Sequence, residues 1–351
     1  RVGSLALPQG RRLAPVDAAA AGDIVALPKL KASETGDVLV EPHTRCDATL
    51  PPLPPPQITY RVLPRHTGDD DKISAGIHRL HEEDPSLVVG HDELTQELTL
   101  AGYGSTHIDI ALERLARKYH VHADKALPRV PYRETLLRGV RDVEGKHKKQ
   151  SGGRGQFGVC TLHLSPLPRG EGYRFIDSIV GGAIPRQYVP AVDKGVREAL
   201  GRGMLAGYPM VDVCVELVDG KSHDVDSSEL AFKIAGSKAV QAAAHAAGVQ
   251  LLEPVMRVDV EVPEASLGDV MGDISARRGH VLGMESAGET VSVRALVPLA
   301  ELLHYANDLK AKTAGQGTFL MTLDRYEPVP QERVGRIIAE SPRRPAAGED
   351  A

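Results

Sequence analysis

A run of prolines near residue 50 divides this chain more sharply than any other feature. Residues 51–56 read PPLPPP. Proline has no backbone N–H and holds φ near a single value, so this stretch cannot continue a helix or a central strand. Proline-rich segments are stiff spacers. We therefore predict a linker here, with a separate folding unit on each side.

The length of the chain also indicates several domains. It has 351 residues, and length alone favours about two to four domains. Residues 1–49 contain a short apolar run at 24–27 and a turn signal at 34–37 (ETGD), which predict the tail of a β domain. Residues 341–351 are rich in proline, alanine and charge, which predicts disorder.

Hydrophobic spacing predicts a ferredoxin-like module in residues 50–127. Alternating apolar residues indicate strands, and apolar residues at helical spacing indicate helices. Together they predict the order strand, helix, two strands, helix, strand. The segments that carry this pattern are 58–62, 73–80, 94–100 and 108–119. Residues 253–330 repeat it, with predicted strands at 258–262, 291–295 and 319–323 and helices at 267–274 and 302–309.

Residues 128–252 predict a longer α+β module between these two. Apolar and polar residues alternate from 211 to 217, as in a strand with one wet face. A shorter alternation covers 160–164, a helical stripe covers 189–200, and an alanine-rich helix is predicted from 228 to 247, ending at Gly248. The predicted fold class is therefore multidomain α+β.

Composition limits the class of protein. Cys46, Cys160 and Cys214 are far apart, which argues against disulfides or a zinc site and favours a reducing cytoplasm.

No apolar stretch approaches the roughly 18 residues of a spanning helix, so we expect no membrane partner. No signal peptide is visible at the start, and the chain begins without methionine, which favours a fragment. The net charge of −5 counts mildly against a nucleic-acid binder, although local basic clusters decide phosphate contact.

The segment 153–158 spells G-x-G-x-x-G in the wrong surroundings for a dinucleotide site. Such a site needs an apolar strand before the glycines and a helix after them, whereas here a basic stretch precedes and an alternating strand follows. We predict a basic, glycine-rich loop between two strands that can approach a phosphate or base edge. Its charges are Lys146, Lys148, Lys149 and Arg154, Gly155 gives backbone freedom, and Phe157 can stack on a base. The alternative is a solvated hairpin.

Three other polar segments have plainer explanations. Gly220-Lys221-Ser222 resembles the end of a phosphate-binding loop, but the required earlier glycine is Val215, so we predict no nucleotide hydrolysis by this chain. Residues 223–229 (HDVDSSE) can cap the following helix, which does not explain His223. Residues 277–280 (RRGH) can complement a helix dipole or bind a phosphate backbone. No catalytic or metal-binding motif stands out.

Two strings resemble the fourth domain of bacterial elongation factor G: residues 150–158 (QSGGRGQFG) and 223–237 (HDVDSSELAFKIAGS). Shorter segments at 102–104, 131–135, 277–279 and 313–317 resemble other parts of the same family, up to about residue 340. The resemblance implies the end of β-barrel domain II at 1–49, ferredoxin-like domain III at 50–127, domain IV at 128–252, ferredoxin-like domain V at 253–330, and a C-terminal helix and disordered tail at 331–351. It further implies that the last helix, at 333–339, packs on domain IV.

The resemblance also implies partners and sites. It places Arg154, Gly155, Gln156, Phe157, His223 and Asp224 against A-site tRNA and mRNA. It places Arg277, Arg278, Gly279 and His280, with Lys146, Lys148 and Lys149, against rRNA. The implied mechanism is mechanical: a GTPase domain outside this chain binds GTP and Mg, domains III and V act as hinge and anchor, and domain IV occupies the A site. The implied partners are the ribosome and that GTPase domain. The implied state is a cytoplasmic monomer, with no cofactor or catalytic residue in this segment.

Departures from the family pattern leave alternatives open. Ser105 and Thr106 precede His107 where the family usually has Gly-x-Gly-Glu-Leu-His, and Ser222 stands where it often has an aromatic residue. A translocase therefore stands beside a paralogue that acts in ribosome recycling or in ribosome protection. The short strings at 150–158 and 223–229 favour translocation or recycling over protection. A different class is a free-standing RNA-binding protein of ferredoxin-like modules. A metabolic enzyme using the glycine motif is disfavoured by the flanking elements.

Overall fold

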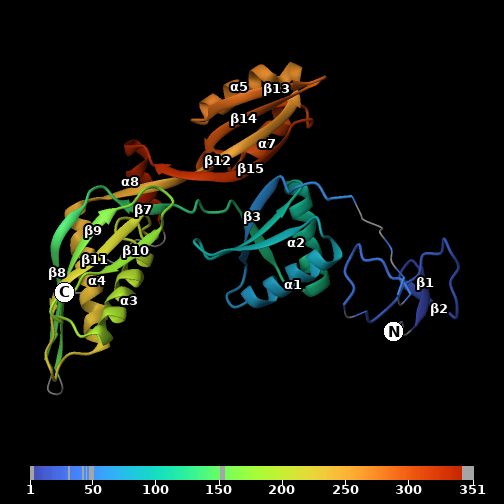
Figure 1. Ribbon diagram of the computed structural model, residues 1–351. Coiled ribbons are helices and arrows are strands. Elements are labelled where there is room, and N and C mark those ends of the chain that lie inside the picture. The colour runs from blue at the N-terminus through green and yellow to red at the C-terminus, as the bar shows by residue number, and fades with distance from the viewer. Residues whose placement is uncertain are drawn as a thin grey trace. The chain divides into compact units, whose positions relative to one another are not determined.

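The computed structural model describes residues 4–30, 32–41, 43–44, 46, 51–150 and 155–341, which form an α+β chain with several sheets (Figure 1). In the N-terminal part, β1 (Leu5–Gln9) and β2 (Arg12–Val16) pair antiparallel, and Gly10 turns the chain at φ 61°. The predicted remnant of a β domain is this two-stranded sheet, and no closed barrel exists within the described ranges. Residues 51–56 form neither helix nor strand, as the prolines predict.

The first ferredoxin-like module has the predicted element order. Its elements are β3 (Ile58–Pro64), α1 (Asp70–Glu83), β4 (Val88–Asp92), β5 (Glu97–Gly102), α2 (Ser105–Tyr119) and β6 (Ala123–Ala126), with sheet order β4-β5-β3-β6. Leu94, which we predicted in a strand, lies in the turn between β4 and β5. The carboxylate of Asp92 accepts hydrogen bonds from the N–H groups of Leu94 and Thr95 and so closes that turn.

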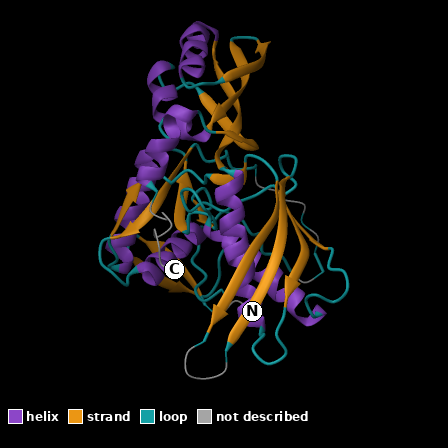
Figure 2. Ribbon diagram, turned by 90° about the vertical axis from the view of Figure 1, so that its left-hand side faces the viewer, coloured by secondary structure: helices purple, strands orange, loops and turns teal. Residues whose placement is uncertain are grey.

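The central module is a four-stranded sheet with two long helices. Its elements are β7 (Arg133–Leu136), β8 (Val140–Lys149), β9 (Gln156–Pro166), β10 (Tyr173–Asp177), the short 3-10 helix η1 (Arg186–Tyr188), α3 (Val189–Arg202), β11 (Val213–Lys221) and α4 (Glu229–Ala247). The sheet order is β10-β11-β9-β8, parallel between β10 and β11 and antiparallel elsewhere. In Figure 2, the long strands of this sheet run together toward one end of the module.

Close approach of backbone holds α4 on this sheet. The alternating side chains Leu162, Leu164 and Val215 bury one face of the sheet under α3 and α4. A Cβ at Gly145 of β8 would lie 2.1 Å from the carbonyl oxygen of Ala235 in α4. The alanine-rich composition of α4 therefore lets the helix sit almost directly on the strand backbone.

The third module repeats the ferredoxin-like order. Its elements are β12 (Val249–Pro263), η2 (Glu264–Ser266), α5 (Leu267–Ala276), β13 (His280–Ala287), β14 (Thr290–Pro298), α6 (Leu299–Leu302), α7 (Tyr305–Lys312) and β15 (Thr318–Pro328), in sheet order β13-β14-β12-β15, with β7 pairing to the start of β12. The single helix that we predicted at 302–309 is two helices. The chain turns at Leu303 and His304, and Tyr305 is then buried edge-on against Phe319.

The last helix, α8 (Gln331–Glu340), lies where the resemblance implied one. Its residues Val334, Ile337 and Ile338 pack against a buried cluster that includes Ala206 and Leu251, as do Tyr132 and Tyr208 of the central module. The hydroxyl of Ser341 donates to the carbonyl oxygen of Ala206 (2.6 Å). The expected packing of this helix on the central module is therefore present. The rest of the predicted disordered tail, residues 342–351, lies outside the described residues.

Candidate nucleic-acid interface

The basic glycine-rich segment joins two strands of one hairpin. β8 and β9 pair antiparallel, with Lys149 opposite Gln156 and Lys148 opposite Phe157. The predicted strand–loop–strand arrangement is therefore correct, and no helix follows the glycines as a dinucleotide site requires. Arg154, which we predicted in this loop, lies outside the described residues.

A second loop lies directly against this hairpin. Residues 222–228 connect β11 to α4, and the backbone N–H of Phe157 donates to the carbonyl oxygen of Asp226 (2.8 Å). The hydroxyl of Ser227 donates to the carbonyl oxygen of Phe157 (2.9 Å), and the two residues form a single parallel β-bridge. Two segments 70 residues apart in sequence thus form one end of the module.

We call Gly155, Gln156, Phe157, His223, Asp224 and Asp226 the tip. The rings of Phe157 and His223 meet edge to face, with their centroids 6.3 Å apart. The Nδ1 atom of His223 accepts from the backbone N–H groups of Val225 and Asp226, both at 3.3 Å. The side chain of His223 is 57% exposed. Its ring is therefore held through Nδ1, and within the described residues its Nε2 is left for a ligand.

The sequence predicted the cap of α4 but not the contacts of Ser227 and Asp226 that support the tip. Ser228, in extended conformation, caps α4 by accepting the N–H of Ala231 (3.2 Å), as the capping interpretation expected. Ser227, one residue earlier, forms the bridge to Phe157, and Asp226 lies under Gly155, whose Cβ would be 2.9 Å from that carboxylate. The sequence signal for these contacts was the pair of consecutive serines before Glu229. A sequence does not say which of two such serines caps the helix and which contacts another loop.

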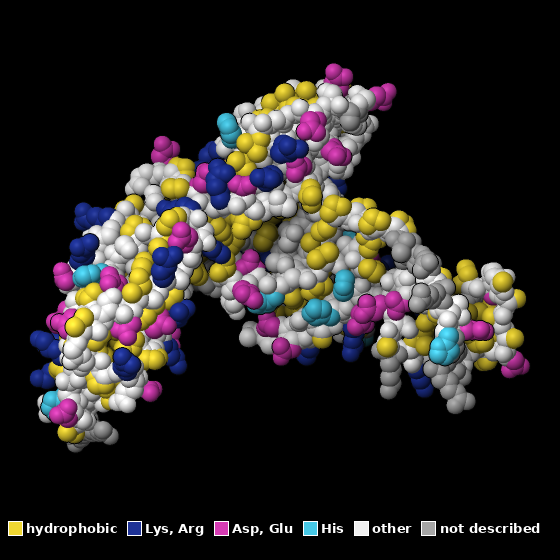
Figure 3. Space-filling model, in the orientation of Figure 1, with side chains coloured by type: hydrophobic (Ala, Val, Ile, Leu, Met, Phe, Trp, Pro, Cys, Tyr) yellow, Lys and Arg dark blue, Asp and Glu magenta, His cyan; other side chains and the backbone are white. Residues whose placement is uncertain are grey.

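Lys146, Lys148 and Lys149 extend the tip along β8. All three are exposed, and none of them forms an ion pair within the described part of the chain. On the face of the module that Figure 3 shows, acidic and basic side chains are interspersed. The unpaired cations therefore give this hairpin the local positive charge that attracts a polyanion, despite the negative net charge.

The described residues contain neither a metal site nor a membrane span. Among them, no group of three or more His, Cys, Asp or Glu side chains could hold a metal ion. No helix in this part of the chain is long and apolar enough to cross a membrane.

Three family descriptions match the chain in order. They are Elongation Factor G, domain III over residues 53–126, Elongation factor G, domain IV over 128–248, and Elongation factor G C-terminus over 250–337. The chain belongs to the elongation factor G family. The tip lies within the range matched to domain IV.

Known relatives agree with this assignment. An "Elongation factor G-like protein" of Thermotoga maritima is 45% identical over 341 residues, which cover 97% of this chain and 50% of that protein. A crystal structure from Thermus thermophilus matches with a TM-score of 0.83 and 37% identity, over 96% of this chain and 51% of that one. This elongation factor G family chain thus spans about half the length of the relatives that it matches.

In the elongation factor G C-terminal domain of this chain, Arg277 is engaged internally. It pairs with Asp273 (2.8 Å) and Asp308 (2.6 Å). Burial lowers the pKa of Arg277, but these carboxylates outweigh it and raise that pKa above its usual value. The hydrogen-bonding capacity of this side chain is therefore largely used within the domain, and its rRNA-facing role stays a prediction.

Arg278 occupies an unusual backbone position. It follows α5 at φ 61°, in the left-handed region, and forms a bidentate ion pair with Glu253 (2.7 and 2.8 Å) and a third contact with Glu301 (3.1 Å). The hydrogen bonds that Arg278 donates to Glu253 are the main reason why the pKa of Arg278 is raised. Gly279 comes next, where a Cβ would lie 2.6 Å from the carbonyl oxygen of Ile274, and His280 is exposed. The rRNA-facing role of these three residues also stays a prediction.

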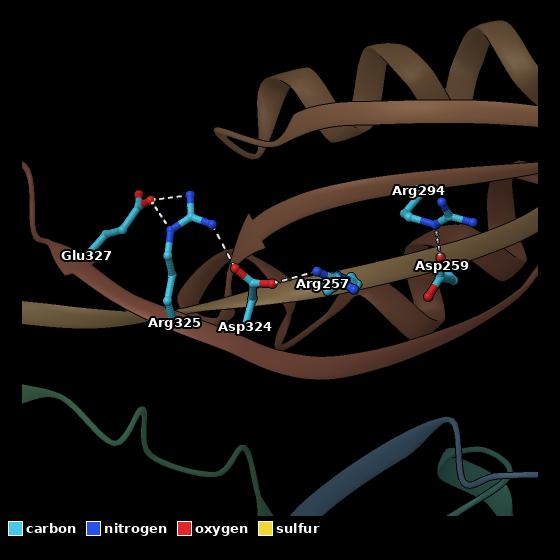
Figure 4. Close-up of polar contacts among 6 residues, drawn as sticks. All are labelled: Arg257, Asp259, Arg294, Asp324, Arg325 and Glu327. Atoms are coloured by element: carbon cyan, nitrogen blue, oxygen red, sulfur yellow. Dashed lines mark hydrogen bonds and ion pairs between the residues drawn. The ribbon is translucent and has the colours of Figure 1, made fainter. Parts of the chain in front are cut away.

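A second set of arginines lies on the sheet of this domain and is also paired (Figure 4). The pairs are Arg257 with Asp324 (3.0 Å), Arg294 with Asp259 (3.2 Å), and Arg325 with Asp324 and Glu327 (both 2.7 Å). Each cation faces a carboxylate of its own or a neighbouring strand. This set therefore offers phosphate less free charge than the three lysines of β8 do.

Proposed function

We propose that this chain is the ribosome-binding part of a translational GTPase that promotes tRNA–mRNA translocation during elongation. Membership of the elongation factor G family supports a role in translation. The observation that carries the finer proposal is the bridge between Phe157 and Ser227, because it joins two loops into one exposed surface. On that surface the ring of Phe157 meets the imidazole of His223, the amide of Gln156 comes from the next residue of β9, and the three lysines of β8 lie on the paired strand.

The chemistry of the tip suits RNA contact that does not depend on sequence. A translocating factor must accept every codon, so it has to use phosphate, sugar, shape and stacking rather than a base code. The three lysines of β8 can neutralise phosphates, the ring of Phe157 can stack, and His223 and Gln156 can hydrogen-bond to a backbone. The partners that we propose are rRNA, A-site tRNA, mRNA and the protein's own GTPase domain, with the protein acting as a cytoplasmic monomer.

We place GTP and Mg binding outside this chain. Gly220 and Lys221 are the last residues of β11 and α4 begins only at Glu229, so this motif does not lie at the start of a helix as the end of a phosphate-binding loop does. Titration of GTP into this chain in a calorimeter should therefore give no binding heat. Measurable affinity would contradict this part of the proposal.

The proposal is tested with the whole protein in a purified translation system. The double variant Gln156→Ala with His223→Ala should slow translocation by roughly tenfold or more, because two hydrogen-bonding groups are lost. The control is Gln331→Ala with His91→Ala, an exposed glutamine and an exposed histidine outside the tip, which should leave the rate unchanged. Unchanged translocation with loss of ribosome splitting would replace the translocase with a recycling paralogue. If neither activity changed, the tip would not be the RNA-contacting surface.

A further inference from the structure

We propose that His147 is a positioning residue that fixes the orientation of the Gln156 side chain, so that Gln156 presents its amino group to RNA. This inference rests on the proposed function, because it concerns how the same tip contacts its ligand. Neither a sequence motif nor the family resemblance singled out His147.

The hairpin register places the two side chains on one face. In β8 and β9, His147 lies opposite Gly158 and Lys149 lies opposite Gln156, so His147 and Gln156 are diagonal neighbours. Gly158 has no side chain, and a Cβ there would already lie 3.0 Å from the backbone of Ala231. The imidazole of His147 therefore has no side chain directly opposite it and reaches the next residue on that face, Gln156.

The contact between them is a hydrogen bond of ordinary length. The Nε2 atom of His147 lies 2.9 Å from Oε1 of Gln156, and both residues are half-buried. An imidazole that carries a proton on Nε2 donates to this oxygen. The carbonyl oxygen of Gln156 is then occupied. Within the described residues, its amino group has no hydrogen-bond partner.

Fixing the amide selects what Gln156 can recognise. A free glutamine side chain can rotate and offer either a donor or an acceptor. With its oxygen held by His147, it offers only N–H donors. Phosphate oxygens and 2′-hydroxyls accept such a donor at any nucleotide, and in the minor groove every base pair shows an N3 or O2 acceptor. An outward carbonyl would instead need a donor, which among minor-groove base edges only guanine supplies. The held orientation therefore suits contact that is independent of sequence.

The first experiment examines the geometry in this chain without any ribosome. The side-chain amide resonances of Gln156 should shift in the NMR spectrum of His147→Ala and return toward the original position in His147→Gln, which restores an N–H donor. His163→Ala is the matched control, because His163 lies on β9 but contacts Asp142 instead (3.0 Å). An unchanged Gln156 amide in His147→Ala overturns the proposal, whatever the protein does on the ribosome.

The second experiment is a double-mutant cycle for translocation by the whole protein. His147→Ala should slow translocation by about fivefold, the effect of one hydrogen bond, and His147→Gln should recover most of the rate. In a Gln156→Ala background, His147→Ala should have no further effect, because its action passes through Gln156. An equal loss in both backgrounds would mean that His147 only holds the hairpin together and would overturn the proposal.

The two experiments separate the two levels of inference. If Gln156→Ala alone left translocation unchanged while the amide shift was seen, the proposed RNA contact of Gln156 would fail and the His147–Gln156 geometry would stand. If Gln156→Ala slowed translocation but His147→Ala did not, the proposed function would stand and the positioning role would fail.

Discussion

Ser227 and Phe157 form the bridge that joins the two loops of the domain IV tip. The Ser227 hydroxyl donates to the carbonyl oxygen of Phe157 at 2.9 Å. The same hydroxyl accepts the backbone N–H of His223 at 2.8 Å. One nearly buried hydroxyl therefore fixes the position of the aromatic ring on one loop and the imidazole on the other.

Ser227→Ala should loosen the tip without unfolding the domain. Removing the hydroxyl leaves the carbonyl of Phe157 and the N–H of His223 without this partner, at a cost of about 1 kcal/mol. We expect faster hydrogen–deuterium exchange at residues 223–227 and slower translocation by the whole protein. Ser228→Ala is the matched control, because it removes the α4 cap at a cost of about 1 kcal/mol while leaving the bridge intact. Equal translocation rates in the two variants would show that the bridge does not set the geometry of the tip.

Arg278→Ala should destabilise the C-terminal domain. It leaves the carboxylate of Glu253, whose side chain is 4% exposed, without its bidentate partner. Breaking a fully buried pair costs about 3–5 kcal/mol. Arg278 keeps 26% of its side-chain surface exposed, so we expect the free energy of unfolding to fall by only on the order of 2 kcal/mol. Urea unfolding monitored by hydrogen exchange at β12 and β14 measures this loss.

The control for Arg278 is Arg257, an exposed arginine on β12 of the same domain. Arg257 pairs with Asp324 but is 51% exposed (Figure 4). Arg257→Ala should change stability by less than about 0.5 kcal/mol. If Arg278→Ala were as mild as this, its side chain would be available for the rRNA contact that the family resemblance implies.

Gly145→Ala should destabilise domain IV through overpacking. The new Cβ would lie 2.1 Å from the carbonyl oxygen of Ala235, so α4 must move away from β8. We expect a loss of about 1–3 kcal/mol, measured as increased exchange along α4. Gly272→Ala, in the middle of α5 with no atom within 4 Å of its Cβ position, should instead stabilise its domain by about 0.5–1 kcal/mol. Destabilisation by both variants would point to a general intolerance rather than to contact with α4.

Acid should weaken domain III through Asp84. Burial alone would raise the pKa of Asp84, but hydrogen bonds from Ser86 and His107 outweigh it and hold that pKa below the usual 3.8. The unfolded chain therefore binds more protons than the folded chain in this range, so stability falls as the pH drops through 3.8 toward the lower folded value.

Hydrogen exchange of α1 and α2 at pH 5 and pH 3 measures this effect. Wild type should lose more protection between the two values than Asp84→Asn, which has no carboxylate to protonate. Asp71→Asn, an exposed carboxylate of α1, should behave like wild type. An identical loss in wild type and Asp84→Asn would remove Asp84 as the source of acid sensitivity.

Sequence periodicity predicted most elements and failed where its signal is weak. The alanine-rich stretch before Gly248 gave α4 to within one residue at each end, whereas the alternation from 211 to 217 identified β11 but missed its last four residues. β13 was missed because it is an edge strand with a register shift between Val281 and Gly283 and with Leu282 and Met284 exposed, so it lacks an alternating pattern. The break between α6 and α7 was missed because leucines on both sides continue the helical spacing.

The sequence by itself determined the family, the order of the modules and the two loop strings, because these depend on local patterns and on residue identity along the chain. Only the tertiary structure decided that Phe157 meets Ser227, that His147 holds Gln156, and that Arg278 is paired with Glu253. Each of these contacts joins atoms from different strands or loops. Strand register and helix packing set such distances, and no local pattern records them.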